Sequence, residues 1–207
     1  MDWKSSDPVV PGPRTEEHLP HTARAAVKIV IVGGFGVGKT TMVGSVSEIR
    51  PLTTEETMTQ AGIGVDDNFG SDSKTATTVA MDFGRISITE QLVLYLFGTP
   101  GQERFWFLWN GLFEGALGAV VLLDTRRLEV SFDVIGRLEE RGVPFVVAVN
   151  SFPDAPRHPM KELRAALDLS DEIPIVECDA RRRASGRDVL LTLMRFLHSP
   201  ATARAPV

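Results

Sequence analysis

Residues 33–40 read GGFGVGKT and fit the pattern G-x-x-x-x-G-K-[ST], which is typical of loops that hold phosphate groups. The β-branched run 27–32 precedes this loop and has the length of a buried strand. Apolar residues then recur at helical spacing through 41–49. A glycine loop between a strand and a helix surrounds a phosphate with backbone N–H groups and the positive end of the helix dipole. The alternative, a glycine-rich turn that fits by chance, would leave these flanking elements unexplained, so we predict a nucleoside triphosphate site.

Within this loop, Lys39 is expected to place its charge between the β- and γ-phosphates, and the Thr40 hydroxyl to coordinate Mg²⁺. The loop residues expected to bind nucleotide are Gly33, Gly34, Gly36, Val37, Gly38, Lys39, Thr40 and Thr41.

Composition limits the class of protein. The 207 residues suffice for one α/β domain with a complete core, and 43% hydrophobic and 24% charged residues are ordinary globular values. A net charge of −5 argues against a general nucleic-acid binder. One cysteine, Cys178, suits a reducing compartment, and no apolar run reaches the ~18 residues of a membrane span. With no signal peptide or lipidation motif either, we predict a cytoplasmic protein that contacts membranes only through partners.

Three segments are expected along the chain. Residues 1–24 are rich in proline and lack a periodic apolar pattern, which predicts a disordered arm. The alternative is an ordered arm that packs across the domain through Trp3. Residues 25–198 form the folded domain, and residues 199–207 a loose tail.

The folded domain is predicted to alternate strands with helices. Residues 51–76 read as a long functional loop, and Gly84-Arg85 as the turn of a hairpin between an edge strand and the central strand 92–97. Further strands are expected at 116–123, 143–149 and 173–177, and helices at 103–114, 128–141, 160–168 and 187–197. The expected fold is α/β, with a mostly parallel six-stranded sheet, one antiparallel edge strand and helices on both faces. Loops that leave the carboxyl ends of the strands, 33–40, 98–102, 150–154 and 178–181, should form the site.

The order of GGFGVGKT, a later threonine, GTPGQ at 98–102, VNSFPD at 149–154 and CDAR at 178–181 resembles that of Ras-like small GTPases. The stretches TTVAMDFGRI, YLFGTPGQERFWF and VVLLDTRR resemble more closely the bacterial conservon-type GTP-binding proteins, relatives of the MglA polarity GTPases. The resemblance covers residues 27–197. It implies a P-loop G domain whose ligands are GTP or GDP and Mg²⁺.

The resemblance also assigns roles in switch I (51–78) and switch II (98–110). Thr78 matches the threonine that senses Mg²⁺ and the γ-phosphate, and Gly101 the glycine whose N–H contacts the γ-phosphate. Gln102 matches the glutamine that orients the attacking water. The expected catalytic residues are Gln102, Lys39 and Thr78.

The base-recognition segments are also matched by resemblance. Asn150 matches the motif asparagine, and Asp179, Ala180 and Arg181 match the segment whose backbone contacts the base oxygen. The motif carboxylate, which bonds the N1–H and N2–H groups of guanine, stands one residue late as Asp154. A preference for guanine is therefore expected, with ATP as the open alternative.

Two departures concern the γ-phosphate end. The metal-linked Asp of switch II is replaced by Gly98, and Asp82 on the neighbouring strand is the candidate to act through water. The alternative for Asp82 is a surface carboxylate. The expected metal ligands are thus Thr40, Thr78 and Asp82. Phe35 stands where a small residue is usual and would crowd an incoming arginine finger.

No arginine lies between Pro51 and Gly84, so switch I offers no arginine finger in cis. Arg50, Arg85 and Arg104 are the fallback candidates, with solvated side chains as the alternative.

Aromatic residues follow Gln102 directly. Four residues at helical spacing are expected in the core: Phe105, Trp109, Leu112 and Phe113. Trp106 and Phe107 point elsewhere, either to a partner or to the underside of switch I.

We predict a molecular switch with slow intrinsic GTP hydrolysis. The resemblance implies as partners a roadblock-type protein, a sensor histidine kinase and a DUF742-type protein, acting at the inner membrane surface. The alternatives are a nucleotide-binding module without hydrolysis and, less consistent with GTPGQ, a phosphotransferase acting on a small acceptor.

Overall fold

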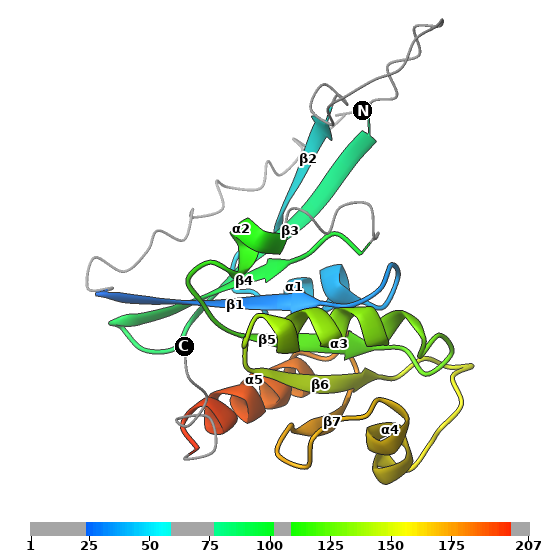
Figure 1. The fold of residues 1–207 in the computed structure, drawn as a ribbon. Helices are drawn as coiled ribbons and strands as arrows, with labels where there is room; N and C mark the ends of the chain where they lie inside the picture. The colour runs from blue at the N-terminus through cyan, green and yellow to red at the C-terminus, as the bar shows by residue number, and fades with distance from the viewer. Residues whose placement is uncertain (1–23, 59–76, 102–108, 200–207) are drawn as a thin grey trace, which may run out of the picture.

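The computed structural model describes residues 24–58, 77–101 and 109–199. In this part of the chain one seven-stranded sheet has the order β2-β3-β4-β1-β5-β6-β7 (Figure 1). The strands are β1 (Ala25–Val32), β2 (Leu52–Met58), β3 (Thr77–Ser87), β4 (Leu92–Gly98), β5 (Ala116–Leu123), β6 (Phe145–Asn150) and β7 (Ile175–Cys178). Four strand pairings are parallel: β1 with β4, β1 with β5, β5 with β6 and β6 with the edge strand β7. The predicted class, a mostly parallel α/β sheet with one antiparallel strand, is confirmed.

Helices cover both faces of the sheet (Figure 1). They are α1 (Lys39–Val46), α2 (Trp109–Phe113), α3 (Val130–Glu140), α4 (Met160–Ala166) and α5 (Arg183–Leu197). One apolar cluster joins the sheet to α1 and α5, and a second joins the other face to α2 and α3. Trp109, Leu112 and Phe113 are buried as predicted, whereas Phe105, Trp106 and Phe107 lie outside the described residues. None of the helices in the described ranges is both long and apolar enough to cross a membrane.

The predicted loop 51–76 is wrong in its first part, because β2 occupies Leu52–Met58 and pairs antiparallel with β3. The sheet therefore has one strand more than the six predicted, and β3, the antiparallel strand, lies one position in from the edge. Only Asp82 to Ser87 of β3 pair with β4. The rest of β3 pairs with β2 alone, and the two strands run together away from the body of the sheet (Figure 1).

The turn predicted at Gly84-Arg85 is also wrong, since β3 continues through both residues and the chain turns at 88–91. Gly84 is needed for packing instead of a turn. A Cβ there would lie 2.8 Å from Val43 Cγ1 of α1, so a side chain would push the helix off the sheet. The predicted helix 103–114 is confirmed only at α2, because residues 102–108 lie outside the described ranges. The other elements stand within a few residues of their predicted positions, with α1 ending at Val46 and α5 beginning at Arg183.

Candidate functional site

The glycine loop joins the carboxyl end of β1 to the first residue of α1. Gly33, Gly36 and Gly38 have φ values of 141°, 75° and 104°, a region that residues with a Cβ rarely adopt. Gly38 is also constrained from outside, because a Cβ there would lie 2.7 Å from Asn150 Nδ2. The loop therefore has the strand, helix and backbone form that a phosphate site requires.

Lys39 lies inside this loop and is 7% exposed. Its Nζ donates to the carbonyl oxygens of Gly33 at 2.8 Å and Gly34 at 2.7 Å. Burial lowers the pKa of Lys39 to about 8, and the negative charge of Asp82 opposes this shift. The loop therefore holds the Lys39 ammonium at two of its own carbonyls.

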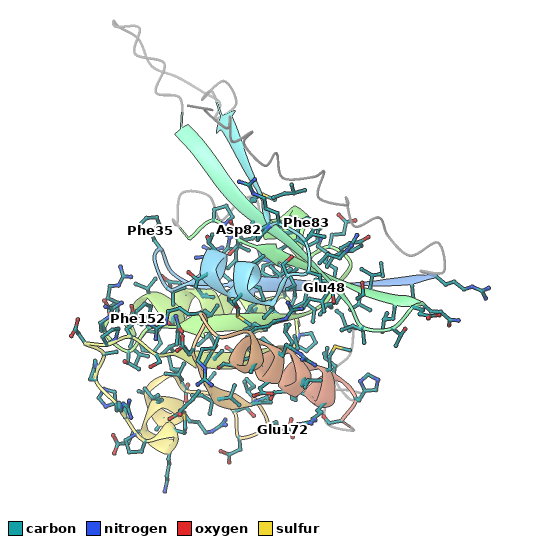
Figure 2. All side chains as sticks on the ribbon, turned by 180° about the vertical axis from the view of Figure 1, so that it is seen from behind. Phe35, Glu48, Asp82, Phe83, Phe152 and Glu172 are labelled. Carbon is teal, nitrogen blue, oxygen red and sulfur yellow. The ribbon has the colours of Figure 1, made fainter. Side chains whose placement is uncertain are left out.

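Asp82 meets the first turn of α1. The Thr40 hydroxyl donates to Asp82 Oδ2 at 2.5 Å, and the carboxylate is buried. Across the β3–β4 pairing Asp82 is opposite Gly98, and a Cβ on Gly98 would lie 3.1 Å from Asp82 Oδ2. The Asp82 carboxylate therefore occupies the space next to Gly98. Its alternative as a surface carboxylate is excluded. Figure 2 shows Asp82 beside α1 and the Phe35 ring projecting from the loop.

Asn150 connects the loop to the far end of the site. Its Nδ2 donates to the Val37 carbonyl at 2.9 Å, and its Oδ1 accepts the Ala180 backbone N–H at 2.9 Å. Asn150 is buried, and Ala180 is also buried. One side chain thus holds three segments together at the carboxyl edge of the sheet.

Two carboxylates near Asn150, those of Asp179 and Asp154, differ in their surroundings. Asp179 accepts from Arg181 Nε at 2.9 Å and Nη2 at 3.0 Å, and these hydrogen bonds lower the pKa of Asp179. Asp154 is exposed in the loop after β6, where its charge acts on Arg126. An open cavity of about 440 Å³ borders Asn150, Phe152 and Asp179. The structure thus has space for a ligand beside Asn150.

The residues predicted to surround a γ-phosphate lie partly within the described ranges. A Cβ on Gly101 would lie 2.7 Å from Lys39 Nζ and 2.8 Å from the Phe35 backbone, so Gly101 is brought to the loop as predicted. The backbone of Thr78 pairs with Thr57 in the β2–β3 ladder. Phe35 is 65% exposed. Gln102 and Arg104 lie outside the described residues.

Arg85 is not a solvated side chain, because it is 8% exposed within β3. Its backbone bonds Ser47 and Glu48, beyond the C-terminal end of α1. The phosphate loop lies at the opposite end of this helix, so Arg85 does not serve as the predicted fallback finger. Arg50 is exposed beyond the same end of α1.

Three charged residues in the turn after β5, which contribute to the stretch VVLLDTRR, had no predicted functional role. Asp124 is buried and accepts hydrogen bonds from Arg126, and Arg127 bonds the phosphate loop. The available signal was an Asp at the carboxyl end of a buried strand, followed by two arginines.

A family model described as "Conserved hypothetical ATP binding protein" matches residues 31–199 of the chain. The chain belongs to this family. The match includes the whole glycine loop, residues 33–40, together with Asp82, Asn150 and Ala180. Members of the conserved hypothetical ATP binding protein family thus share the region that holds the site.

Individual relatives match over part of their length. An uncharacterized protein of Methanocaldococcus jannaschii is 28% identical over 60% of this chain and 69% of its own length. The Ras-related protein Rab-11C of Dictyostelium discoideum is 29% identical over 74% of this chain, and RABA3 of Arabidopsis thaliana 31% over 59%. The chain spans 58% and 44% of these two Ras-related proteins.

Solved structures with a similar fold include two from T. maritima FeoB. Its G domain matches with a TM-score of 0.56 and 16% identity, over 83% of this chain and 99% of that one. The cytosolic domain in a GDP form matches with a TM-score of 0.59 and 15% identity, over 85% and 65% of the two chains. This family member therefore has the fold of G domains, as the resemblance to Ras-like proteins implied.

Proposed function

We propose that this chain is a GTP-binding molecular switch that hydrolyses GTP slowly. The observation that carries the proposal is the convergence of Lys39, the Thr40–Asp82 pair and Asn150 on one glycine loop. The similarity to Ras-related proteins supports guanine nucleotides as ligands. The closer resemblance to conservon-type proteins and MglA relatives supports a role as a bacterial signalling switch.

The residues act by positioning and charge. Lys39 and the loop N–H groups bind the phosphates, the Gly101 N–H contacts the γ-phosphate, and Gln102 orients the attacking water. At the other end, Asn150 and Asp154 bind the base, with the backbone of 179–181 at its oxygen.

A Mg²⁺ ion fits beside Thr40. The Thr40 hydroxyl and the Asp82 carboxylate present two oxygens 2.5 Å apart next to the loop, and oxygen donors are the ligands that Mg²⁺ prefers. Among the described residues, no group of three or more His, Cys, Asp or Glu side chains is placed to hold a metal ion by itself. Waters and phosphate oxygens would therefore complete the ligands of Mg²⁺, as is common for this ion. We assign Thr40 as a direct ligand, Thr78 as a second one and Asp82 as a ligand through water. The ion would offset negative charge on the β- and γ-phosphates.

Titration of the nucleotide-free protein with GTP, GDP and ATP tests the choice of base. We expect GTP and GDP to bind at micromolar concentrations or tighter and ATP to bind at least about a hundredfold more weakly, a gap of about 2.7 kcal/mol. The physical reason is that the Asp154 carboxylate bonds two donors of guanine that adenine lacks. Equal affinity for ATP would refute guanine recognition and leave an adenine-nucleotide site.

A second candidate is a nucleotide-binding module without hydrolysis, for either GTP or ATP. The family description favours ATP, and the exposed Asp154 lies in a loop where its charge acts on Arg126. Phe35 and Gly98 at the γ-phosphate end also favour this candidate.

Single-turnover hydrolysis distinguishes the two candidates. For a switch, we expect a slow rate that falls about tenfold or more in Gln102→Leu, because the attacking water loses its orienting group. The matched control for this substitution is Gln91→Leu in the β3–β4 turn. Equal rates in wild type and Gln102→Leu would support the non-hydrolytic module.

By resemblance, we propose a roadblock-type protein as a partner that accelerates hydrolysis. The two proteins would act within an assembly with a sensor histidine kinase and a DUF742-type protein at the inner membrane surface.

A further inference from the structure

The turn after β5 contains a buried carboxylate held by two arginines. Asp124 has a 4% exposed side chain and accepts from Arg126 Nε at 2.9 Å, Arg126 Nη2 at 2.7 Å and the Arg126 backbone N–H at 3.0 Å. Arg127 Nη2 lies 3.8 Å from the same carboxylate. These hydrogen bonds lower the pKa of Asp124. The turn therefore fixes the directions of both arginine side chains.

Arg127 extends from this turn to the phosphate loop. Its Nη2 donates to the Phe35 carbonyl at 2.7 Å, and a Cβ on Gly36 would lie 3.5 Å from the same nitrogen. Three side chains thus bond carbonyls of this loop: Lys39 from within the loop, and Arg127 and Asn150 from later parts of the chain. Arg127 bonds the Phe35 carbonyl, next to the Gly34 carbonyl that Lys39 bonds, and both carbonyls lie between Gly33 and Gly36, two of the three loop glycines with positive φ.

The same turn contacts the loop after β6. The Arg126 guanidinium lies 4.0 Å from the centre of the Phe152 ring, and the Asp154 charge also acts on Arg126. Thr125 Oγ1 donates to the Pro156 carbonyl at 2.8 Å. Figure 2 shows Phe35 and Phe152 at the same edge of the molecule. One turn therefore bonds the two loops that would hold opposite ends of a nucleotide.

We propose that residues 124–127 are a positioning element that sets how long a bound nucleotide stays. The proposal rests on the nucleotide-binding function proposed above and adds Asp124, Arg126 and Arg127 to it. Arg127 acts by holding the Phe35 carbonyl, a backbone group of the loop. Its loss should therefore affect GDP and GTP alike. Because the contact holds the loop instead of the γ-phosphate, the number of phosphates should not matter.

Dissociation of fluorescent GDP and GTP from Arg127→Ala tests the proposal. We expect both dissociation rates to rise about tenfold, since a hydrogen bond from a charged donor to the loop is lost. Arg127→Lys should recover most of the loss, because its ammonium still reaches a carbonyl acceptor. Phe152→Leu, which removes only the ring in contact with the Arg126 guanidinium, should raise both dissociation rates less than Arg127→Ala does. Arg187→Ala, an exposed arginine on α5, is the matched control and should match wild type.

Amide hydrogen exchange in the nucleotide-free protein provides a readout independent of binding. Arg127→Ala should speed exchange within residues 33–38, and Arg187→Ala should not. If wild type binds neither nucleotide, the proposed function fails and this proposal fails with it. If wild type binds both nucleotides but Arg127→Ala leaves dissociation and loop exchange unchanged, the positioning element alone is refuted. A rise for GTP only would also refute it, because that result would place Arg127 at the γ-phosphate.

Discussion

Replacing Lys39 with methionine is expected to lower the affinity for both GTP and GDP at least about a hundredfold, or about 2.7 kcal/mol. Methionine has a similar length but no charge, so the side-chain packing in the loop is kept and the cation that phosphates would contact is lost. The buried position of Lys39 strengthens this effect, because charge interactions are less screened away from water. Calorimetric titration of purified wild type and Lys39→Met measures the difference.

Lys28→Met is the matched control. The Lys28 ammonium bonds the Gly111 and Glu114 carbonyls and has no hydrogen bond to the glycine loop among the described residues. Its loss should leave the affinity for GTP and GDP within about twofold of wild type. If Lys39→Met binds GTP within about fivefold of wild type, the glycine loop is not the phosphate site. The proposed function would then lose its main support.

The pH dependence of stability gives Lys39 a second signature without nucleotide. Its pKa is about 8 in the folded chain and 10.5 when unperturbed, so between these values the unfolded chain holds more protons. The free energy of unfolding should therefore gain about 3 kcal/mol from this group as pH rises from 8 to 10.5. Below pH 8 that contribution is absent. Chemical denaturation across this window should show the gain in wild type and lose it in Lys39→Met.

The fold could be predicted where local sequence decides structure. The loop at 33–40 and the strand at 116–123 stand where the sequence placed them, because glycine spacing and buried β-branched runs are local signals. β2 carries no such signal. Its sequence LTTEETM has no apolar alternation, and it is formed through backbone pairing with β3 at the sheet edge. The glycine at position 84 predicts a turn, but glycine permits both turns and close packing, and only the position of α1 decides between them.

In the candidate site, too, local motifs predict some positions and only the tertiary structure reveals others. The sequence placed Asp82 on the strand next to the one that ends at Gly98, and the pairing of β3 with β4 confirms this. The direct pairing of Asp82 with Gly98 was visible only in the structure. The positions of Lys39 and Asn150 followed from motifs. Arg127 could not be found this way, since its partner Phe35 lies 92 residues earlier and is bonded through a backbone carbonyl. A contact to a carbonyl places no demand on the partner's residue type, so neither sequence position signals the other.

Replacing Asp82 with asparagine is expected to remove most of the Mg²⁺ dependence of GTP binding. We expect the gain in affinity on adding Mg²⁺ to fall about tenfold or more, because the buried carboxylate beside Thr40 supplies negative charge that an amide lacks. Affinity without Mg²⁺ should change little. Titrations with GTP over a series of free Mg²⁺ concentrations measure the gain. Asp133→Asn, an exposed position on α3, is the control of matched chemistry.

Exchanging the two strand positions makes the test sharper. A Cβ on Gly98 would lie 3.1 Å from both the Asp82 Cβ and Oδ2, so a carboxylate placed on β4 would enter the space that Asp82 now fills. The single variant Gly98→Asp should crowd Asp82 and lower stability through two adjacent carboxylates. The double variant Asp82→Gly, Gly98→Asp should recover much of the Mg²⁺ dependence that Asp82→Gly loses. If Asp82→Asn keeps the full Mg²⁺ dependence, Asp82 holds Thr40 in place without serving the metal, and the carboxylate of the missing switch II Asp has no substitute on β3.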